Sequence, residues 1–289
     1  MANDVERTGI VGGGQMGAGI AEVCARAGLT VNVVELEGAA AQRAKERIRR
    51  SLDRAVERNK LEASERDAAL GRVTVGTDVD ALADCDLVIE AAPEDLAIKH
   101  EIFERLDRLV NPETILATNT SSLSIARIAV ATSDPDRVIG LHFFNPAPVQ
   151  PLVEVVPSLQ TSEEVHVRTD RLAREVLGKT PITCPDRAGF VVNALLVPYL
   201  LNAIRMVEAG LASAEDVDTG MVNGCAHPMG PIALSDLVGL DTVLAVAEAL
   251  HGELADPTCA PPPLLRRMVE AGRLGKKTGR GFYTYDTGP

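Results

Sequence analysis

The sequence predicts an α/β protein, in which an N-terminal Rossmann doubly wound sheet is followed by an all-helical C-terminal domain. A glycine-rich turn joins a short apolar strand to a helix within residues 7–27. Apolar strand patterns then alternate with helical patterns up to residue 185, which is typical of a parallel sheet covered by helices. No strand pattern occurs between residues 189 and 280. We therefore expect a sheet domain over 1–185 and a helical domain over 186–289.

The elements of the first domain follow from the period of its apolar residues. Strands are expected at 7–11, 30–34, 72–75, 86–90, 114–118, 137–141 and 152–156. Helices are expected at 15–27, 38–58, 64–70, 95–109, 122–131 and 162–177. The long helix at 38–58 is rich in arginine, and most of these charges are expected to form a solvated face with ion pairs one turn apart.

The second domain is expected to begin with one long apolar helix over 189–210, bent at Pro198. Ser213 and Asp216 resemble a capping box that opens the next helix, with aspartate in place of glutamate. Further helix starts are expected at Pro231 and Asp241, and helix ends at Gly239, Gly252 and Gly272.

The glycine-rich turn has the spacing that a dinucleotide pyrophosphate requires. Gly12 permits a tight turn, Gly14 lets the phosphates approach the backbone, and Gly17 lets helix and strand pack closely. The helix that follows presents free N–H groups to the anion. Glu35 ends the next strand and is suited to bind both ribose hydroxyls and repel a 2′-phosphate, which favours NAD over NADP. Basic residues nearby leave the strictness of that preference open.

Composition excludes several classes of function. The net charge of −12 argues against nucleic-acid binding, and no apolar run is long enough to span a membrane. The five cysteines are scattered without a C-x-x-C pair, and the histidines lack metal-ligand spacing, so no metal site is expected. Reduced thiols and an N-terminus without a signal-peptide pattern indicate a cytoplasmic protein.

Polar residues gather where the predicted strands end, which is where a Rossmann sheet binds its ligands. Glu94 and Lys99 follow the strand at 86–90, and a purely structural ion pair at a helix start explains them equally well. The run 118–122 reads T-N-T-S-S and offers amide and hydroxyl groups to a cofactor or substrate. One of these residues is expected to cap a helix starting near 123.

His142 follows the strand at 137–141, and Glu154 lies within the apolar strand at 152–156. A carboxylate inside such a strand is costly to bury unless it is paired, and His142 is its natural partner. This pair would suit a dehydrogenase, because the imidazole can take a hydroxyl proton while the carboxylate orients the ring. Asn193 stands among apolar residues and is expected to find buried partners, either by tying helices together or by facing a cleft.

Several motifs together resemble the L-3-hydroxyacyl-CoA dehydrogenase family, and within it the short, stand-alone bacterial 3-hydroxybutyryl-CoA dehydrogenases. In chain order they read V-G-G-G-Q-M-G-A-G-I, T-N-T-S-S-L, L-H-F-F-N-P, L-V-E-V-V, G-F-V-V-N, H-P-M-G-P and G-K-K-T-G-R-G-F-Y-T-Y. The resemblance implies oxidation of the 3-hydroxyl of an acyl-CoA to a ketone with NAD. It also implies a homodimer formed through the C-terminal domain.

The resemblance also implies roles for individual residues. His142 and Glu154 would form the acid–base pair, and Ser121 and Asn193 would hydrogen-bond the substrate oxygen. Cofactor contacts would come from Gly12, Gly14, Gln15, Met16, Gly17, Glu35, Glu94, Lys99, Asn119 and Asn145. Contacts to CoA would come from Ser51, Arg58 and Lys60. Two positions depart from the family pattern, since Ala194 and Pro151 stand where arginine and a basic residue are frequent.

Other functions fit the sequence less well. A serine hydrolase built from Ser121, His142 and Glu154 would lack a G-x-S-x-G turn and would leave the glycine motif without a task. A non-catalytic NAD sensor would be expected to have lost the acid–base pair. Relatives acting on carrier-protein-tethered acyl groups stay an open alternative, because the basic stretch 43–60 suits a phosphate or an acidic carrier protein alike. Acyl chain length and physiological direction also stay open.

Overall fold

The computed structural model describes residues 5–286, so the ends of the two predicted domain ranges, 1–4 and 287–289, lie outside the described residues. The chain divides into two compact units between Asp186 and Arg187, one residue beyond the boundary expected from the sequence. Each unit has its own hydrophobic core and is described by itself.

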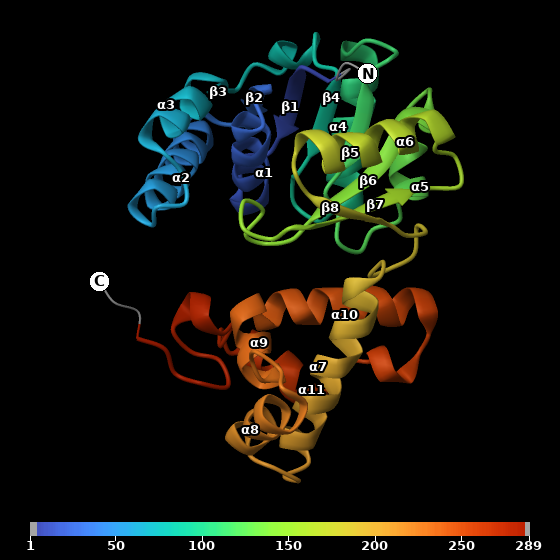
Figure 1. Cartoon of the computed structure of the whole chain (residues 1–289). Helices are drawn as coiled ribbons and strands as arrows, with labels where there is room; N and C mark the ends of the chain where they lie inside the picture. The colour runs from blue at the N-terminus through green and yellow to red at the C-terminus, as the bar shows by residue number, and fades with distance from the viewer. Residues whose placement is uncertain (1–4, 287–289) are drawn as a thin grey trace. The chain divides into compact units, whose positions relative to one another are not determined.

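The first unit contains an eight-stranded sheet in the order β3-β2-β1-β4-β5-β6-β7-β8 (Figure 1). Its strands are β1 Arg7–Val11, β2 Thr30–Val34, β3 Val73–Gly76, β4 Leu87–Glu90, β5 Ile115–Thr118, β6 Val138–Phe143, β7 Leu152–Pro157 and β8 Thr180–Thr183. The first six strands run parallel, β7 is antiparallel to β6, and β8 is parallel to β7. The order reverses at β1, as in a doubly wound fold, so the predicted fold class is confirmed.

Strand β8 was not predicted, because Pro181 lies inside this four-residue strand. Proline lacks a donor for the hydrogen-bond ladder, so a proline in a short run argues against a strand in the interior of a sheet. At the sheet edge the missing donor costs little, and β8 is the last strand of the sheet.

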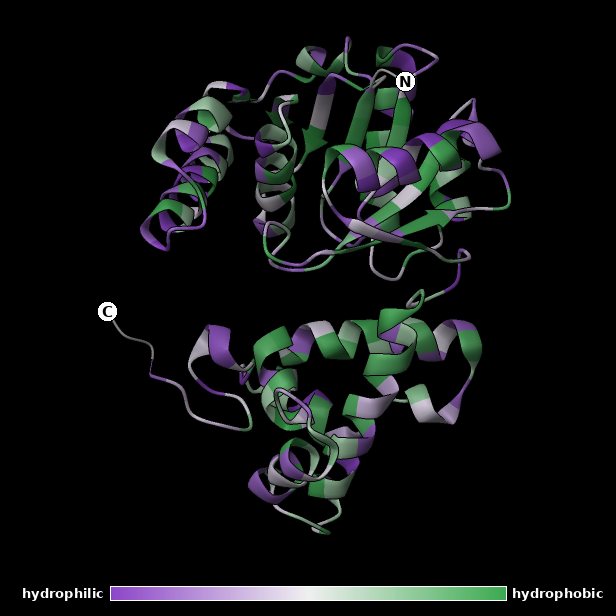
Figure 2. Ribbon diagram, in the orientation of Figure 1, coloured by the Kyte–Doolittle hydropathy of each residue, from purple (hydrophilic) through white to green (hydrophobic). Residues whose placement is uncertain are grey.

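Helices lie on both faces of the sheet; in Figure 1, α1 and α6 lie in front of it and α4 lies behind. They are α1 Gln15–Arg26, α2 Gly38–Glu57, α3 Ala63–Gly71, α4 Leu96–Leu109, α5 Ile125–Ala129 and α6 Glu163–Arg171, with a π-helical turn over Leu172–Val176. Short 3₁₀ turns at Val79–Leu82 and Pro135–Arg137 were not predicted. The strands are mostly apolar along their length, whereas α2 and α3 are largely polar (Figure 2).

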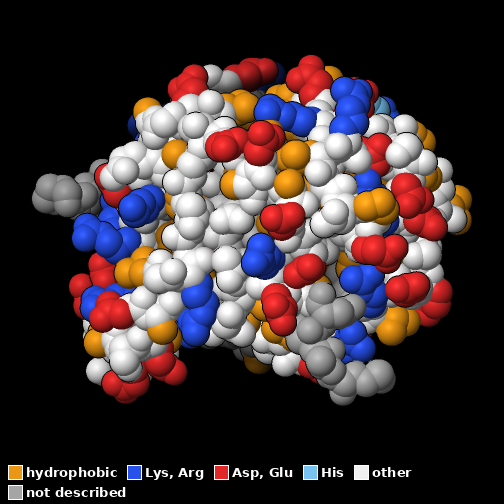
Figure 3. All heavy atoms as spheres, turned by 90° about the horizontal axis from the view of Figure 1, so that it is seen from above, with side chains coloured by type: hydrophobic (Ala, Val, Ile, Leu, Met, Phe, Trp, Pro, Cys, Tyr) orange, Lys and Arg blue, Asp and Glu red, His pale blue; other side chains and the backbone are white. Residues whose placement is uncertain are grey.

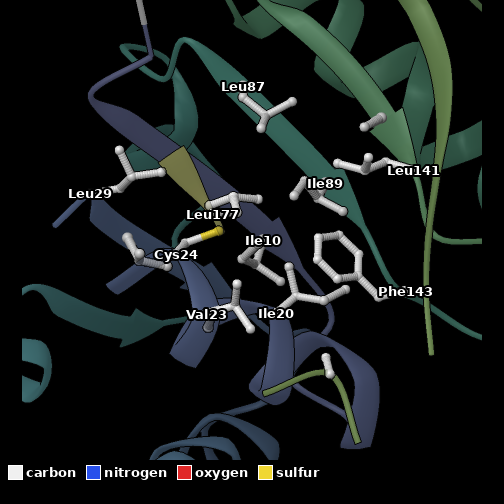
Figure 4. Close-up of a cluster of buried hydrophobic side chains, with 14 of the residues drawn as sticks. Ile10, Ile20, Val23, Cys24, Leu29, Leu87, Ile89, Leu141, Phe143 and Leu177 are labelled. Atoms are coloured by element: carbon white, nitrogen blue, oxygen red, sulfur yellow. The ribbon is translucent and has the colours of Figure 1, made fainter. Parts of the chain in front are cut away.

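The core of the first unit lies between α1 and the middle of the sheet (Figure 4). Ile10, Ile20 and Cys24 are fully buried there, together with Ile89. Burial of the Cys24 thiol raises its pKa to about 12, so it stays protonated and behaves as a small apolar side chain. Close packing of α1 on β1 requires Gly17, since a Cβ there would collide with the carbonyl oxygen of Gly12.

The second unit is helical, as predicted. Its helices are α7 Val192–Glu208, α8 Ala214–Cys225, α9 Pro231–Val238, α10 Leu240–Leu254 and α11 Pro263–Glu270, with 3₁₀ turns at Pro257–Cys259 and Lys276–Thr278. The expected helix end at Gly252 is wrong, because α10 continues to Leu254. A glycine in a helix interior costs only about 1 kcal/mol relative to alanine, which the buried face of α10 outweighs.

Ser213 does cap α8, since its Oγ accepts from the N–H of Asp216 at 3.0 Å. The reciprocal half of a capping box is replaced by a bond from Ser213 Oγ to the Asp216 carboxylate at 2.8 Å. The long helix α7 starts three residues later than expected because Gly189 and Phe190 have left-handed φ values of +74° and +48°.

Asp236 of α9 anchors the last described segment of the chain. Its carboxylate is fully buried and accepts hydrogen bonds from the N–H groups of Phe282 and Tyr283 and from the Tyr285 hydroxyl, at 3.0, 2.9 and 3.0 Å. Gly281 lies directly against this carboxylate, where a Cβ would not fit. Burial, followed by the Asp236 charge, raises the pKa of the Tyr285 hydroxyl.

The surface shown in Figure 3 carries acidic and basic side chains mixed together, with no continuous basic area on that face. Among residues 5–286, no helix is both long and apolar enough to cross a membrane.

Candidate active site

The glycine turn between β1 and α1 has the backbone geometry that its sequence requires. Gly12 has a φ of +91°, and a Cβ there would lie 2.8 Å from the carbonyl oxygen of Ala91. At Gly14, by contrast, a Cβ would meet no atom within 4 Å. Gly14 is also the residue preceding α1, and no side chain caps that helix. The first turn of α1 thus presents backbone N–H groups toward open space, as an anion-binding helix terminus does.

Glu35 and Arg47 both hydrogen-bond to the backbone of Gly13, between Gly12 and Gly14 of the turn. The Glu35 carboxylate accepts from the Gly13 N–H at 2.7 Å, and the Arg47 guanidinium donates to the Gly13 carbonyl at 2.8 Å. Glu35 is therefore fixed beside the turn, at the position expected for a ribose-binding carboxylate. This role of Arg47 was not predicted, because one arginine among many on α2 carries no signal of its own.

Two further predicted cofactor residues meet at the start of α1. Gln15 Nε2 donates to Asn145 Oδ1 at 2.9 Å, which joins α1 to the segment that follows β6. Met16 is half-buried and packs against the apolar core rather than facing away from it.

A buried ion pair lies at the end of β4. Lys99 Nζ donates to both carboxylate oxygens of Glu90, at 2.7 and 2.8 Å, and both side chains are at most 1% exposed. Lys99 is 3.5 Å from Glu94, so the predicted Glu94–Lys99 pair exists but is the longer of the two. Glu90 was missed, although an acidic residue ending an apolar strand is the same signal that pointed to Glu154. The Thr118 hydroxyl also donates to Glu90, at 2.7 Å.

Glu94 accepts hydrogen bonds from several residues of the polar run that follows β5. One of its oxygens accepts from the Thr120 hydroxyl at 2.6 Å, from the Ser121 N–H at 3.0 Å and from the Ser122 N–H at 3.1 Å. The Ser121 hydroxyl is 3.3 Å from the same oxygen. Partial burial raises the pKa of Glu94, but Lys99 and these donors outweigh it, so its pKa lies below the ordinary value. The carboxylate is therefore charged near neutral pH.

The expectation that a residue of 118–122 caps the following helix is wrong. The helix α5 starts at Ile125, and its cap is Ser124, assisted by the Asp186 carboxylate, which accepts from the Ile125 and Ala126 N–H groups at 2.8 Å each. Asn119 instead accepts from the Phe143 N–H at 2.9 Å, which ties the ends of β5 and β6 together.

His142 and Glu154 form the bond expected of them. They are directly opposed residues of the antiparallel β6–β7 pair, and His142 Nδ1 lies 2.7 Å from Glu154 Oε2. The histidine side chain is 8% exposed and the glutamate is fully buried. The Phe144 ring packs against the imidazole at a centroid distance of 4.6 Å. Burial, followed by the charge of Glu154, raises the pKa of the neighbouring Cys184 thiol to about 12.

The remaining predicted residues lie elsewhere. Ser51 is half-buried on α2, while Arg58 and Lys60 are exposed where α2 ends. Asn193 belongs to the second unit, in the first turn of α7, and is partly exposed. Within residues 5–286, no group of acidic, histidine and cysteine side chains is arranged to hold a metal ion.

Comparison with known proteins gives matches to both units. Residues 7–187 match the family model of the 3-hydroxyacyl-CoA dehydrogenase NAD binding domain, and residues 189–285 match that of the C-terminal domain. A 3-hydroxybutyryl-CoA dehydrogenase of Mycobacterium tuberculosis is 58% identical over 286 residues, covering 99% of this chain and 100% of the relative.

Solved structures agree with these matches. The crystal structure of M. tuberculosis FadB2 has a TM-score of 0.96 and 58% identity, covering 97% of this chain and 99% of that chain. The structure of (S)-3-hydroxybutyryl-CoA dehydrogenase PaaH1 from Ralstonia eutropha has a TM-score of 0.93 and 47% identity, covering 98% of this chain and all of that chain.

Proposed function

The chain belongs to the 3-hydroxyacyl-CoA dehydrogenase family, and from this premise we propose that it reversibly oxidises a (3S)-3-hydroxyacyl-CoA to the 3-ketoacyl-CoA with NAD. We take 3-hydroxybutyryl-CoA as the substrate, because the relatives at 58% and 47% identity carry that name. One observation carries the proposal most directly: the buried His142–Glu154 hydrogen bond lies at the end of a Rossmann strand.

The turn after β1 fits NAD. Gly14 leaves open space where the pyrophosphate would approach the start of α1, and Glu35 is held where it can accept from ribose hydroxyls. Asn119, Asn145 and Gln15 offer amide groups around the ends of β5 and β6. NAD supplies the acceptor for the hydride that leaves C3 of the substrate.

His142 is the proposed general base for oxidation and the general acid for reduction. Its Nδ1 is bonded to Glu154, so Nε2, on the opposite side of the ring, is the nitrogen that takes the proton of the 3-hydroxyl. The Glu154 carboxylate keeps the ring oriented and stabilises the imidazolium that forms. Buried in an apolar strand, that carboxylate interacts with the ring with little screening by water.

Ser121 and Asn193 are the proposed donors to the C3 oxygen. Their hydrogen bonds would strengthen as negative charge develops on this oxygen, so alanine at either position is expected to lower kcat more than substrate affinity. The Ser121 hydroxyl donates to the Glu94 carboxylate at 3.3 Å, so the substrate oxygen has to compete with that carboxylate for the hydroxyl proton. Ser51, Arg58 and Lys60 are proposed to bind CoA, whose phosphates suit the two exposed cations.

We also propose a cytoplasmic homodimer. All five cysteines are free thiols and four of them are buried, as suits a reducing compartment. Seven large apolar side chains of the second unit are exposed, which supports a subunit interface there: Val191, Leu195, Met206, Leu211, Met229, Leu237 and Val238. Light scattering should give twice the mass of the chain, and a monomer at micromolar concentration would contradict the dimer.

The decisive experiment follows the absorbance of reduced cofactor with acetoacetyl-CoA, supplying NADH and NADPH in turn. Rapid oxidation of NADH with little oxidation of NADPH is the expected result. Activity with NADPH alone would contradict the cofactor assignment. If neither cofactor is oxidised by a protein that binds NADH, the CoA substrate is wrong, and acetoacetyl groups tethered to a carrier protein become the next substrate to test.

A further inference from the structure

Asn145 lies in the segment that connects β6 to β7. Its first turn closes through hydrogen bonds from the Val149 and Gln150 N–H groups to the Pro146 carbonyl, at 2.9 and 3.0 Å. Asn145 is exposed and bonded to Gln15. We call residues 145–151 the Asn145 loop. Its placement sets where the Asn145 amide lies relative to the glycine turn.

Lys179 and helix α1 contact this loop from two sides. Lys179, the residue before β8, donates from Nζ to the carbonyl oxygens of Ala147 and Gln150, at 2.6 and 2.8 Å. On the other side the loop touches α1, where a Cβ at Gly19 would lie 3.2 Å from Ala147 Cβ and 3.3 Å from Pro148 Cδ. One ammonium group therefore joins both ends of the loop's turn.

Apolar packing supports only part of the loop, because Ala147 is buried in the core of the first unit whereas Val149 is exposed. A cavity of about 630 Å³ lies against the loop and is lined by Pro148, Val149 and Pro151, with Lys179 at its wall. Where the loop borders this cavity, the hydrogen bonds from Lys179 add to the restraint that the packing of Ala147 provides. Burial, followed by the positive charge of Arg26, lowers the pKa of Lys179, while Glu22 acts in the opposite direction. The Lys179 ammonium is therefore partly removed from water, and its hydrogen bonds to the loop carbonyls replace part of its hydration.

We propose that Lys179 is a positioning residue for the nicotinamide half of the cofactor, acting through the Asn145 loop. In a Rossmann domain the pyrophosphate lies at the start of α1, and the second nucleotide half extends past the switch point toward the later strands. Asn145, two residues after the end of β6 and hydrogen-bonded to the first residue of α1, lies on that side. The inference rests on the proposed function, since it concerns NAD at the same site.

The test compares two ligands that share the adenosine half. NADH contains the nicotinamide ring and ADP-ribose does not. Lys179→Met, which keeps the length of the side chain but removes its charge and donors, should raise the Kd of NADH roughly tenfold, the loss typical of hydrogen bonds to a charged group. The Kd of ADP-ribose should stay unchanged. NADH fluorescence and calorimetry measure the two affinities, and Lys179→Arg should restore most of the NADH affinity.

Two controls separate positioning from general stability. Arg174→Met removes an exposed cation from the neighbouring helical turn and should leave both affinities unchanged. Asn145→Ala combined with Lys179→Met should bind NADH no more weakly than Asn145→Ala alone, because both act through one contact. Should Lys179→Met not fold, Lys179→Gln lacks the same charge and takes its place.

Three outcomes would overturn the inference: an unchanged NADH affinity, an equal loss for NADH and ADP-ribose, or additive losses in the double variant. A wild-type protein that does not bind NADH would instead refute the proposed function itself.

Discussion

Lys99 and Glu90 form a bidentate ion pair that is almost completely removed from water, with Nζ–O distances of 2.7 and 2.8 Å. Lys99 is also 3.5 Å from Glu94, which in turn accepts a hydrogen bond from Thr120 in the polar run after β5. Breaking a buried pair by removing one charge usually costs about 3–5 kcal/mol, because the partner is left uncompensated.

We therefore expect Glu90→Gln to lower the free energy of unfolding of the protein by about 3 kcal/mol. Urea unfolding followed by circular dichroism measures the change. Glu104→Gln is the matched control on α4, where Glu104 pairs with Arg108 at 3.6 Å on the surface, and it should change stability by less than about 1 kcal/mol. Equal effects for the two variants would show that burial of the Glu90–Lys99 pair is unimportant.

Glu154→Gln tests the orientation of His142. The amide keeps the shape of the side chain but cannot stabilise the imidazolium, so kcat should fall roughly tenfold or more. NADH affinity should change little. Steady-state kinetics with acetoacetyl-CoA and a binding titration measure the two quantities, with the exposed Glu163→Gln as control. A wild-type kcat would leave Glu154 with only a structural role.

Glu35→Gln tests cofactor selectivity. The carboxylate beside the glycine turn should repel the 2′-phosphate of NADPH. Its neutralisation should therefore lower the ratio of kcat/KM with NADH to kcat/KM with NADPH. Arg47, already bonded to the same turn, is close enough in the fold to favour a phosphate once Glu35 is neutral. Glu37→Gln, a change at an exposed neighbouring residue, should leave the ratio unaltered. If the Glu35 variant kept the ratio of the wild type, selectivity would have to come from elsewhere.

Glu94 should make stability depend on acidic pH. Its pKa is lowered in the folded protein from the ordinary value of 4.5, so the unfolded chain binds the proton more tightly. The stabilisation is fully present above the ordinary value and is lost as the pH falls through the lower, folded value. Unfolding free energies measured across this range should therefore fall less steeply for Glu94→Gln than for the wild type. Parallel curves would contradict the assignment.

Much of the fold could be predicted because its elements repeat their apolar residues with clear periods. Interior strands such as β4 and β5 are buried along their whole length and are unmistakable. The edge strand β8 could not be recognised in this way. Pro181 is tolerated in it because β8 is the last strand of the sheet, and that position depends on the tertiary fold. The continuation of α10 past Gly252 likewise depends on packing that a local signal does not carry.

The candidate site was predictable where one residue type has one chemical need. A glutamate in an apolar strand requires a partner, and His142 is directly opposite Glu154. The same reasoning applied to Glu90 would have found the partner of Lys99. The roles of Lys179 and Arg47 could not be predicted in this way, because both side chains donate to backbone carbonyl oxygens. Every residue has a carbonyl, so the sequence does not indicate which one a distant side chain will reach.

The anchoring of the last described segment on Asp236 bears on how the protein tolerates changes at its C-terminal end. Proteolytic trimming upstream of Phe282 would remove three donors from one fully buried carboxylate and leave its charge unsolvated. Unfolding of the helical unit would then become less cooperative, although every helix in it would be present. Affinity handles attached after Tyr285 leave these bonds in place, whereas shortened versions ending before it are expected to accumulate as aggregates in the expression host.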